Sequence, residues 1–187
     1  MPNIKSTFDE IIYACIQRDQ KARKELYDLF SAQMYSVCMR YAQNKSQADD
    51  IFQDGFLTVF EKLGELKNSD ALPGWVKTIF VRTALNFNKK EMKYTSIEFV
   101  SNTYDSYVDY DILDELSRKE ITAHIQKLPV KSRMVFNLYV IEGYTHQEIS
   151  DIMKISVGTS KSQLFDAKKT LKNLIGVTSQ NYLQIVV

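Results

Sequence analysis

The residues best suited to recognition chemistry lie near the carboxyl end of the chain, in the run YTHQEISDIMKISVGTSKSQLFDAKKTLKNL. Short hydrogen-bonding side chains alternate there with lysines, a mixture typical of helices that contact nucleic acid. They are Thr159, Ser160, Ser162 and Gln163, with Lys161, Lys168, Lys169 and Lys172. Catalysis is not indicated, because the chain has only two histidines, shows no Cys/His metal spacing and contains no glycine-rich phosphate loop. We therefore expect a binding protein without enzymatic activity, cofactor or metal site.

Two helices joined by a tight turn are predicted to position these side chains. Gly143 is placed to close one helix, Thr145 to cap the next, and the turn is expected from Lys154 to Ser156. A shared apolar core for two helices that cross steeply is available from Ile149, Ile152, Ile155, Val157, Leu164 and Leu171. This is the pattern of a helix-turn-helix, whose second helix enters the major groove of DNA. Helical spacing places Ser162, Phe165, Asp166 and Lys169 on the side away from Leu164 and Leu171. A charged helix face that only meets solvent is the alternative reading of the second helix taken alone.

The first half of the chain predicts a bundle of four helices, since six glycines and three prolines in the whole chain favour helix over sheet and turn. We expect a short helix near Phe8 to Gln17 and a long one from Asp19 to Gln43. The buried face of the long helix should comprise Ala22, Leu26, Leu29, Phe30, Met34, Val37, Cys38 and Tyr41. A third helix, capped by Ser46, should reach Leu63, and a fourth should begin between Asp70 and Pro73 and run to about Met92. Cys15 and Cys38 fit buried free thiols better than a disulfide.

The balance of acidic and basic residues changes along the second half of the chain. Between Ser96 and Glu120 there are seven acidic and two basic residues, whereas Ile121 to Val187 holds eight basic and four acidic ones. The segment from Tyr94 to Tyr110 lacks a helical period and is rich in polar residues, as linkers are. The predicted fold class is therefore all-α, with two small helical domains joined by a flexible acidic linker: a helix bundle at 1–95, the linker at 96–111, and a helix-turn-helix domain at 112–187.

Composition excludes several other classes of protein. The formal net charge of +1 argues against a uniformly basic coat for nucleic acid. The start of the chain has no apolar region behind a basic segment, and no stretch approaches the run of about 18 apolar residues that spans a bilayer. We expect a cytoplasmic protein that does not insert into membranes.

Both halves of the chain resemble one family. The run LPVKSRMVFNLYVIEGYTHQEISDIMKISVGTSKSQLFDAKKTL, from Leu128 to Leu171, resembles region four of bacterial RNA polymerase sigma factors of the extracytoplasmic-function group. ADDIFQDGFLTVFEKL, from Ala48 to Leu63, resembles the region-two helix that docks on the coiled coil of the polymerase beta-prime subunit. GWVKTIFVRTALNFNKK, from Gly74 to Lys90, resembles the adjoining helix that reads the minus-10 element. The resemblance covers roughly residues 8–93 and 112–175.

The resemblance implies three binding surfaces and the partners of each. Core RNA polymerase, through its beta-prime and beta subunits, would be held by Asp50, Gln53 and Asp54, whose spacing places them on one strip of a helix. Minus-10 promoter DNA would be held by Asn68, Ser69, Asp70, Trp75, Lys77, Arg82, Asn86, Lys89 and Lys90. Minus-35 DNA would be held by Thr159, Ser160, Lys161, Ser162, Gln163, Phe165, Asp166, Lys168 and Lys169. An anti-sigma factor is a further implied partner. Without the resemblance, the acidic strip fits a solvated face and Trp75 fits a core residue at least as well.

Four positions depart from the family pattern. Arg82 stands where relatives commonly carry Asn, and Lys154 replaces the usual glycine of the turn. Gln163 and Asp166 occupy positions that are often Arg, which weakens attraction to phosphate, while Asp166 is able to accept a hydrogen bond from cytosine N4. The alternative function is a helix-turn-helix regulator that binds duplex DNA without joining polymerase. A further hypothesis is that the acidic linker folds back on the basic helices and limits DNA binding when polymerase is absent.

Overall fold

The computed structural model describes residues 8–94 and 114–175, and every regular element in these two stretches is helical. The chain divides into two compact units, Met1–Phe99 and Val100–Val187. The predicted all-α fold is confirmed. The acidic segment assigned to the linker lies outside the described residues, as do the predicted boundaries at 95–96 and 111–112.

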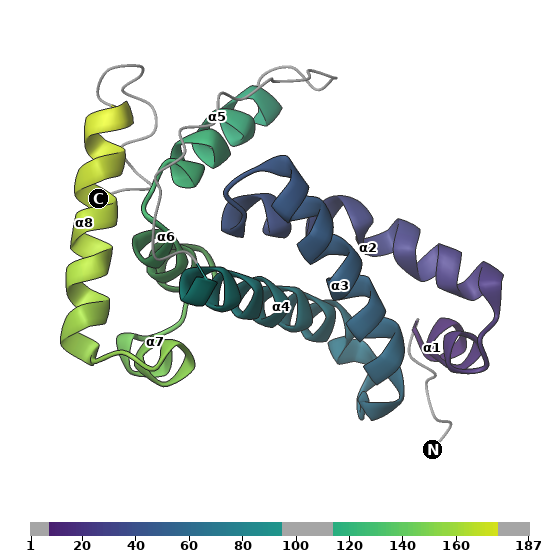
Figure 1. Ribbon diagram of the computed structural model, residues 1–187. Helices are drawn as coiled ribbons and strands as arrows, with labels where there is room; N and C mark the ends of the chain where they lie inside the picture. The colour runs from purple at the N-terminus through teal and green to yellow at the C-terminus, as the bar shows by residue number, and fades with distance from the viewer. Residues whose placement is uncertain (1–7, 95–113, 176–187) are drawn as a thin grey trace. The chain divides into compact units, whose positions relative to one another are not determined.

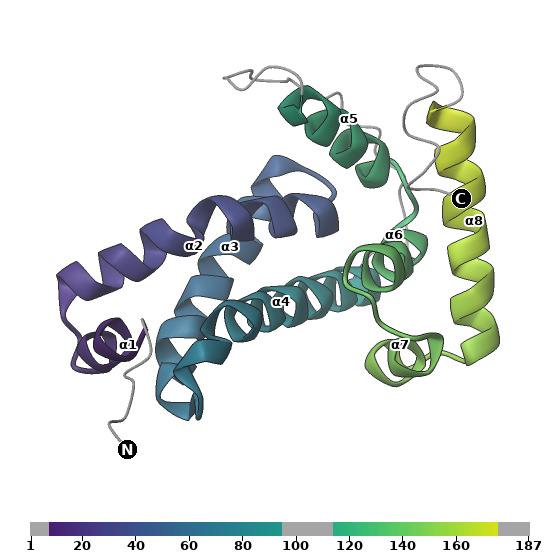
Figure 2. The same ribbon diagram turned by 180° about the vertical axis from the view of Figure 1, so that it is seen from behind.

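The first unit is a bundle built on three long helices (Figures 1 and 2). α1 is Asp9–Ile16, α2 is Gln20–Tyr41, α3 is Lys45–Lys62 and α4 is Leu72–Tyr94. Two short 3₁₀ turns, η1 at Leu63–Glu65 and η2 at Ser69–Ala71, connect α3 to α4. The helices α2, α3 and α4 pack on one another, and α1 packs on α2. These bounds match the predicted helices to within a few residues.

An aromatic cluster joins α3 to its neighbours. Phe80 of α4 is fully buried, and its ring centroid lies 5.1 Å from that of Phe56 in α3. Phe56 also contacts Tyr27 of α2, at 4.7 Å, and Phe52 of its own helix, at 5.1 Å. Gly55 permits this approach, because a β-carbon at that position would lie 2.4 Å from Cε1 of Phe80. The cluster therefore fixes α3 against α4 and so fixes the directions in which their outer faces point.

Two expectations about the first unit are wrong. The N-cap of α3 is Asn44, not Ser46, because the Asn44 side chain accepts a hydrogen bond from the backbone N–H of Gln47 at 2.9 Å. Leu29 is 56% exposed on the outer side of α2 and does not belong to the buried face. Leu26, three residues earlier, and Phe30, the next residue, are buried in the core instead.

Both cysteines are buried free thiols, as predicted. Burial raises the pKa of Cys38 to about 12 and also raises the pKa of Cys15. Neither thiol is therefore activated for nucleophilic or redox chemistry, which requires a lowered pKa and access to solvent.

The second unit contains a short helix pair that leads into the helix-turn-helix. α5 is Asp114–Gln126, α6 is Val130–Phe136, α7 is His146–Met153 and α8 is Val157–Ile175. α6 continues into a π-helical turn, η3, at Asn137–Ile141. α6 packs against α8 along a core of Met134, Val135, Phe136, Leu138, Leu164, Ala167 and Leu171. The side chain of Arg133 is also buried, and its Nη1 donates to the carbonyl oxygen of Gln126 at 2.9 Å.

The start of α7 is built as the sequence predicts. Gly143 has a positive φ of 79°, which reverses the chain after η3. Thr145 caps α7 in a capping box: its hydroxyl accepts from the N–H of Glu148, whose carboxylate accepts from the N–H of Thr145. The hydrogen bonds that the Glu148 carboxylate accepts from Thr145, first from its N–H and then from its hydroxyl, lower the pKa of Glu148. Among the described residues, no helix is both long enough and apolar enough to span a membrane.

Candidate nucleic-acid and protein-binding surfaces

The outer face of α3 carries the three residues predicted to bind polymerase. Asp50, Gln53 and Asp54 are all exposed there. Leu57, one turn further on, is 61% exposed and lies on the same strip, since it follows Gln53 by four residues and Asp54 by three. Together they form an apolar side chain with carboxylates and an amide beside it, which we call the α3 strip (Asp50, Gln53, Asp54, Leu57). Leu57 was not among the residues predicted from the sequence, although its position outside the buried stripe of α3 was the available signal.

A hydrogen bond between helices holds the start of the α3 strip in place. The hydroxyl of Tyr35 in α2 donates to Oδ1 of Asp49 at 2.8 Å, one residue before Asp50. Burial, and then the hydrogen bond to Asp49, raise the pKa of Tyr35 to about 12. The tyrosine therefore stays protonated and remains a donor throughout the physiological pH range.

The residues predicted to hold minus-10 DNA fall into two groups in the loop and on α4. In the loop, Asn68 caps η2, with its Oδ1 accepting from the N–H of Asp70 at 3.1 Å. Asn68 and Asp70 are exposed, whereas Ser69 is half-buried. The amide nitrogen of Asn68 and the hydroxyl of Ser69 are the groups that this loop can direct to a base.

On α4 the predicted residues do not all share one side. Arg82 and Asn86 are exposed and lie one turn apart on one strip of the helix. Trp75, seven residues before Arg82, and Lys89, seven residues after it, are half-buried on the same strip. Lys90, also exposed, borders this strip. Lys77 follows Trp75 by two residues and so lies about 200° around the helix, away from the strip. Trp75 is neither a core residue nor a freely exposed platform, because part of its ring remains accessible while Val76 beside it is fully buried.

On α8 the structure separates the predicted minus-35 residues by exposure. Thr159, Lys161, Ser162, Phe165, Asp166 and Lys169 are exposed, and Gln163 and Lys168 are half-buried. Ser160 is fully buried, so its hydroxyl cannot reach a base edge. It lies 2.9 Å from Nδ1 of His146 in α7, and the His146 ring stacks on Tyr139 at 4.4 Å. Ser160 therefore joins the two helices of the motif, and we remove it from the candidate DNA-binding set.

One other hydrogen bond fixes α8. The hydroxyl of Ser132 in α6 donates to Oε1 of Gln163 at 2.7 Å, which turns the amide carbonyl of Gln163 toward the core.

The pKa of His146 is lowered by burial and then by the charge of Lys161. The imidazole therefore stays neutral near pH 7, where it is able to pair with the Ser160 hydroxyl.

The turn between α7 and α8 spans Lys154 to Ser156, as predicted. Ser150 Oγ donates to the carbonyl oxygen of Ile155 at 2.6 Å, and Ser156 Oγ accepts from the N–H of Thr159 at 2.9 Å. These bonds hold both ends of the turn. Lys154 itself has φ 57° and ψ 47°, the left-handed conformation that glycine adopts without penalty.

Lys154→Gly is expected to stabilise the helix-turn-helix by about 1 kcal/mol, because it removes the cost of a left-handed conformation for a residue with a β-carbon. Hydrogen–deuterium exchange should show slower exchange of the α7 and α8 amides. Arg18, at φ 64°, is a matched control, since Arg18→Gly should slow exchange only near α1 and α2. Faster exchange in α7 of the Lys154→Gly protein would contradict the prediction.

Two known protein-family models match the parts of the chain that carry these surfaces. The family model for Sigma-70 region 2 matches residues 26–94, which include the α3 strip and all of α4. The model for Sigma-70 region 4 matches residues 113–171, which include α5 to α7 and most of α8. Together the two models cover well over half of the chain.

Three similar proteins, each matched over most of its length, are sigma factors by name. The ECF RNA polymerase sigma factor SigK of Mycobacterium tuberculosis is 24% identical over 185 residues, covering 95% of this chain and 98% of that protein. The ECF RNA polymerase sigma-E factor of Salmonella typhimurium is 24% identical over 180 residues, covering 89% and 94%. The RNA polymerase sigma-H factor of Pseudomonas aeruginosa is 23% identical over 175 residues, covering 83% and 89%.

The fold is shared with a solved sigma factor. The structure of RpoE from Bartonella quintana, determined in complex with the anti-sigma factor NepR, matches with a TM-score of 0.53 at 18% sequence identity, covering 83% of this chain and 98% of that one. The order of the two matched regions, the relatives that match over most of their length and the shared fold agree with the resemblance seen in the sequence. The chain belongs to the sigma-70 family, as an RNA polymerase sigma factor of the extracytoplasmic-function group.

Proposed function

We propose that this sigma factor holds core RNA polymerase through the α3 strip and carries promoter DNA on α4 and α8. The observation that carries the proposal is the α3 strip itself. A helix-turn-helix regulator has no use for an exposed leucine framed by Asp54 and Gln53 on a separate helical unit, whereas a polymerase subunit needs such a docking surface. Acidic and amide groups around one apolar side chain suit a partner surface that is basic with an apolar centre.

The strip of α4 that carries Trp75, Arg82, Asn86 and Lys89, with Lys90 at its border, is proposed to hold the melted minus-10 strand. Unstacked bases are bound by aromatic surfaces and cationic grooves. Trp75 supplies a partly accessible ring, Arg82 and Lys90 supply charge, and Asn86 supplies an amide between them. The nearby Asn68 and Ser69 are suited to contact a base that is flipped out of the strand. Lys77, on another side of α4, is proposed to contact only the DNA backbone.

The exposed face of α8 is proposed to lie in the major groove of the minus-35 duplex, with Thr159, Lys161 and Ser162 at the end that enters the groove. Lys168 and Lys169 lie further along and contact phosphates. The proposed domains remain 1–95 for core and minus-10 binding and 112–187 for minus-35 binding, joined by 96–111. The sigma factor brings polymerase to promoters and carries out no chemistry itself.

Its partners and location follow from the same role. We propose that the protein works in the cytoplasm and that an anti-sigma factor keeps it silent. The Bartonella relative was solved with such a factor. The hypothesis that the acidic segment masks the DNA-binding helices concerns residues outside the described part of the chain, and it stays a prediction.

Leu57→Ala is expected to weaken binding to core RNA polymerase about tenfold, since a leucine at the centre of a docking surface loses its buried contact area. Because Leu57 is exposed in the free chain, the fold should be unaffected. Titration of fluorescently labelled chain with core enzyme measures the change.

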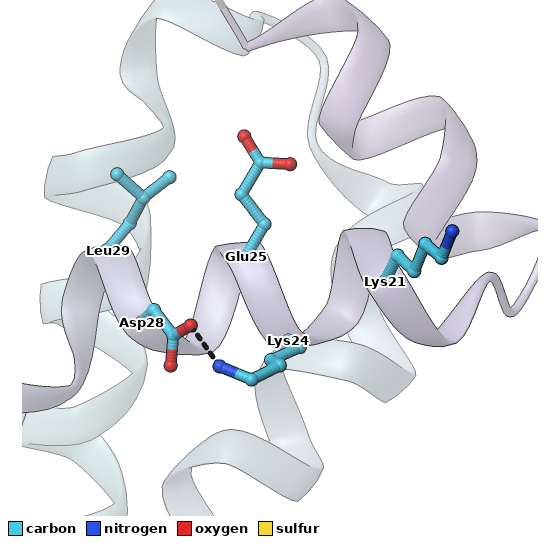
Figure 3. A pocket seen from close by; sticks show the side chains of 5 residues that line it. All are labelled: Lys21, Lys24, Glu25, Asp28 and Leu29. Atoms are coloured by element: carbon cyan, nitrogen blue, oxygen red, sulfur yellow. Dashed lines mark hydrogen bonds and ion pairs between the residues drawn. The ribbon is translucent and has the colours of Figure 1, made fainter.

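A matched control is available on α2. Leu29 is 56% exposed, and the side chain of Glu25 points in the same direction beside it, whereas the carboxylate of Asp28 points away toward Lys24 (Figure 3). This face of α2 is a shallow surface hollow lined by one helix alone, with an ion pair between Lys24 and Asp28. Leu29→Ala should leave the affinity for core enzyme unchanged. Equal effects of the two substitutions would show that the α3 strip is not the docking surface.

A further inference from the structure

Phe165 is the most exposed large apolar side chain on α8, with 67% of its surface accessible. Single exposed apolar residues are common on protein surfaces and need no partner by themselves. The position of Phe165 is unusual because it lies on the outer side of α8, whereas Ser160, Leu164, Ala167 and Leu171 form the buried side. An aromatic ring is therefore presented outward on the helix proposed to enter the major groove.

The charges around Phe165 define what can cover it. Lys161 precedes it by one turn, and Lys168 and Lys169 follow it by one turn, so three ammonium groups surround the ring on the helix surface. An apolar protein partner would have to bury these lysines or pair each one with an acid. Duplex DNA is able to cover the ring and to pair with the lysines at once, because its phosphates meet the lysines while its groove offers base edges to the ring.

Only one base presents an apolar group in the major groove, namely thymine with its 5-methyl group. Asp166 supports a base-facing position, since a carboxylate is repelled by phosphate and accepts hydrogen bonds only from base amino groups. Helical spacing places Lys161 and Lys168 on one side of Phe165, and Lys169 and then Asp166 on the other. The ring therefore has lysines on both sides that are able to meet phosphates, and Asp166, further round the helix than Lys169, is the side chain suited to a base amino group.

We infer that Phe165 reads a thymine in the minus-35 element by packing on its 5-methyl group. The inference rests on the proposed function, because it assumes that α8 enters the groove. It adds that this sigma factor selects thymine at one defined position through a methyl contact, next to a position where Asp166 selects a base that carries an amino group.

The test uses the complete chain bound to core RNA polymerase and a promoter that this holoenzyme selects from genomic DNA. Each thymine of the minus-35 element is replaced in turn by uracil, which removes only the methyl group. At one thymine the affinity of the wild-type holoenzyme should fall about fourfold, as expected for the loss of one buried methyl-sized group. Phe165→Ser should bind the thymine and uracil promoters equally, whereas Phe165→Leu should keep part of the difference.

Lys169→Ala is the matched variant for a phosphate contact. It should weaken binding to every promoter and should retain the preference of the wild type for thymine over uracil. If the wild-type holoenzyme initiates at the promoter but is indifferent to uracil at every position, the inference is overturned and the proposed function stands. An undiminished thymine preference in the Phe165→Ser protein also overturns it. If the chain supports no initiation with core enzyme, both the inference and the proposed function fail.

Discussion

Alanine at both Asp50 and Gln53 is expected to abolish the stable complex of this sigma factor with core RNA polymerase. Both side chains are exposed, so their loss leaves the core of the bundle intact. Truncating one partner of a buried polar or charged contact costs about 2–5 kcal/mol, and two such contacts reduce the affinity by at least about a hundredfold. A pull-down of core enzyme by the tagged double variant, followed by a titration, measures the loss.

A matched double variant separates the α3 strip from charge removal in general. Glu25→Ala with Gln33→Ala also removes one carboxylate and one amide, from exposed positions on α2. That variant should bind core enzyme like the wild type. Lys161→Ala should also retain core binding, while its binding to minus-35 DNA falls. If the Asp50 and Gln53 double variant binds core enzyme normally, the assignment of the α3 strip is wrong.

Phe80→Ala is expected to produce the largest loss of stability, about 3–5 kcal/mol, because it empties the centre of the aromatic cluster between α3 and α4. Phe80 is fully buried, and its ring contacts Phe56 and Phe52 at centroid distances of 5.1 and 6.0 Å. Denaturant unfolding of the full chain can be followed by the fluorescence of Trp75, the single tryptophan, which reports on the first unit alone.

Phe60 supplies the comparison for this prediction. It is half-buried, stacks on Phe56 at 6.1 Å and has the guanidinium of Arg23 over its ring at 5.2 Å. Phe60→Ala removes the same side chain from the edge of the cluster, so it should cost markedly less than Phe80→Ala. Similar losses for the two variants would mean that the cluster does not hold α3 against α4 in the manner described.

The positions of the helices could be predicted from the sequence because their signals are local. A three- and four-residue apolar period, a capping threonine and a glycine that adopts positive φ each act within one or two turns. Thr145, Gly143 and the turn at Lys154 to Ser156 were therefore predicted correctly. The N-cap of α3 was not: Ser46 was predicted, but Asn44, which is an equally good N-cap residue two positions earlier, caps the helix.

Which side chains face outward was harder to predict, because a wide apolar stripe does not show where the neighbouring helices end. Leu29 has the spacing of a core residue, yet α3 and α4 cover only the sides of α2 that hold Leu26 and Phe30. Ser160 is the opposite case, a small polar residue buried because it continues the spacing of Leu164, Ala167 and Leu171. Its hydrogen bond to His146 offsets the cost of burying the hydroxyl. The helical spacing of Ser160 from Leu164 is that of a buried residue, whereas its polar side chain suggested a contact with a base.

The π-helical turn at Asn137–Ile141 had no sequence signal that we could use. In it the N–H of Glu142 donates to the carbonyl oxygen of Asn137, five residues earlier, at 2.9 Å. The N–H of Tyr144 then donates to the carbonyl oxygen of Leu138 at 2.9 Å. This wider turn brings Tyr139 onto His146, so a feature set by tertiary packing contributes to the placement of α7 and α8.

The most direct measurement of the central claim is transcription in vitro with purified core RNA polymerase, this chain and a library of genomic DNA fragments. We expect new transcripts that start at a limited set of sites sharing two elements, that require the chain, and that disappear with the Asp50 and Gln53 double variant. The opposite result would be that core enzyme gives the same transcripts with and without the chain, while the chain alone binds duplex DNA and alters expression without joining the enzyme; this protein would then not act as a polymerase subunit.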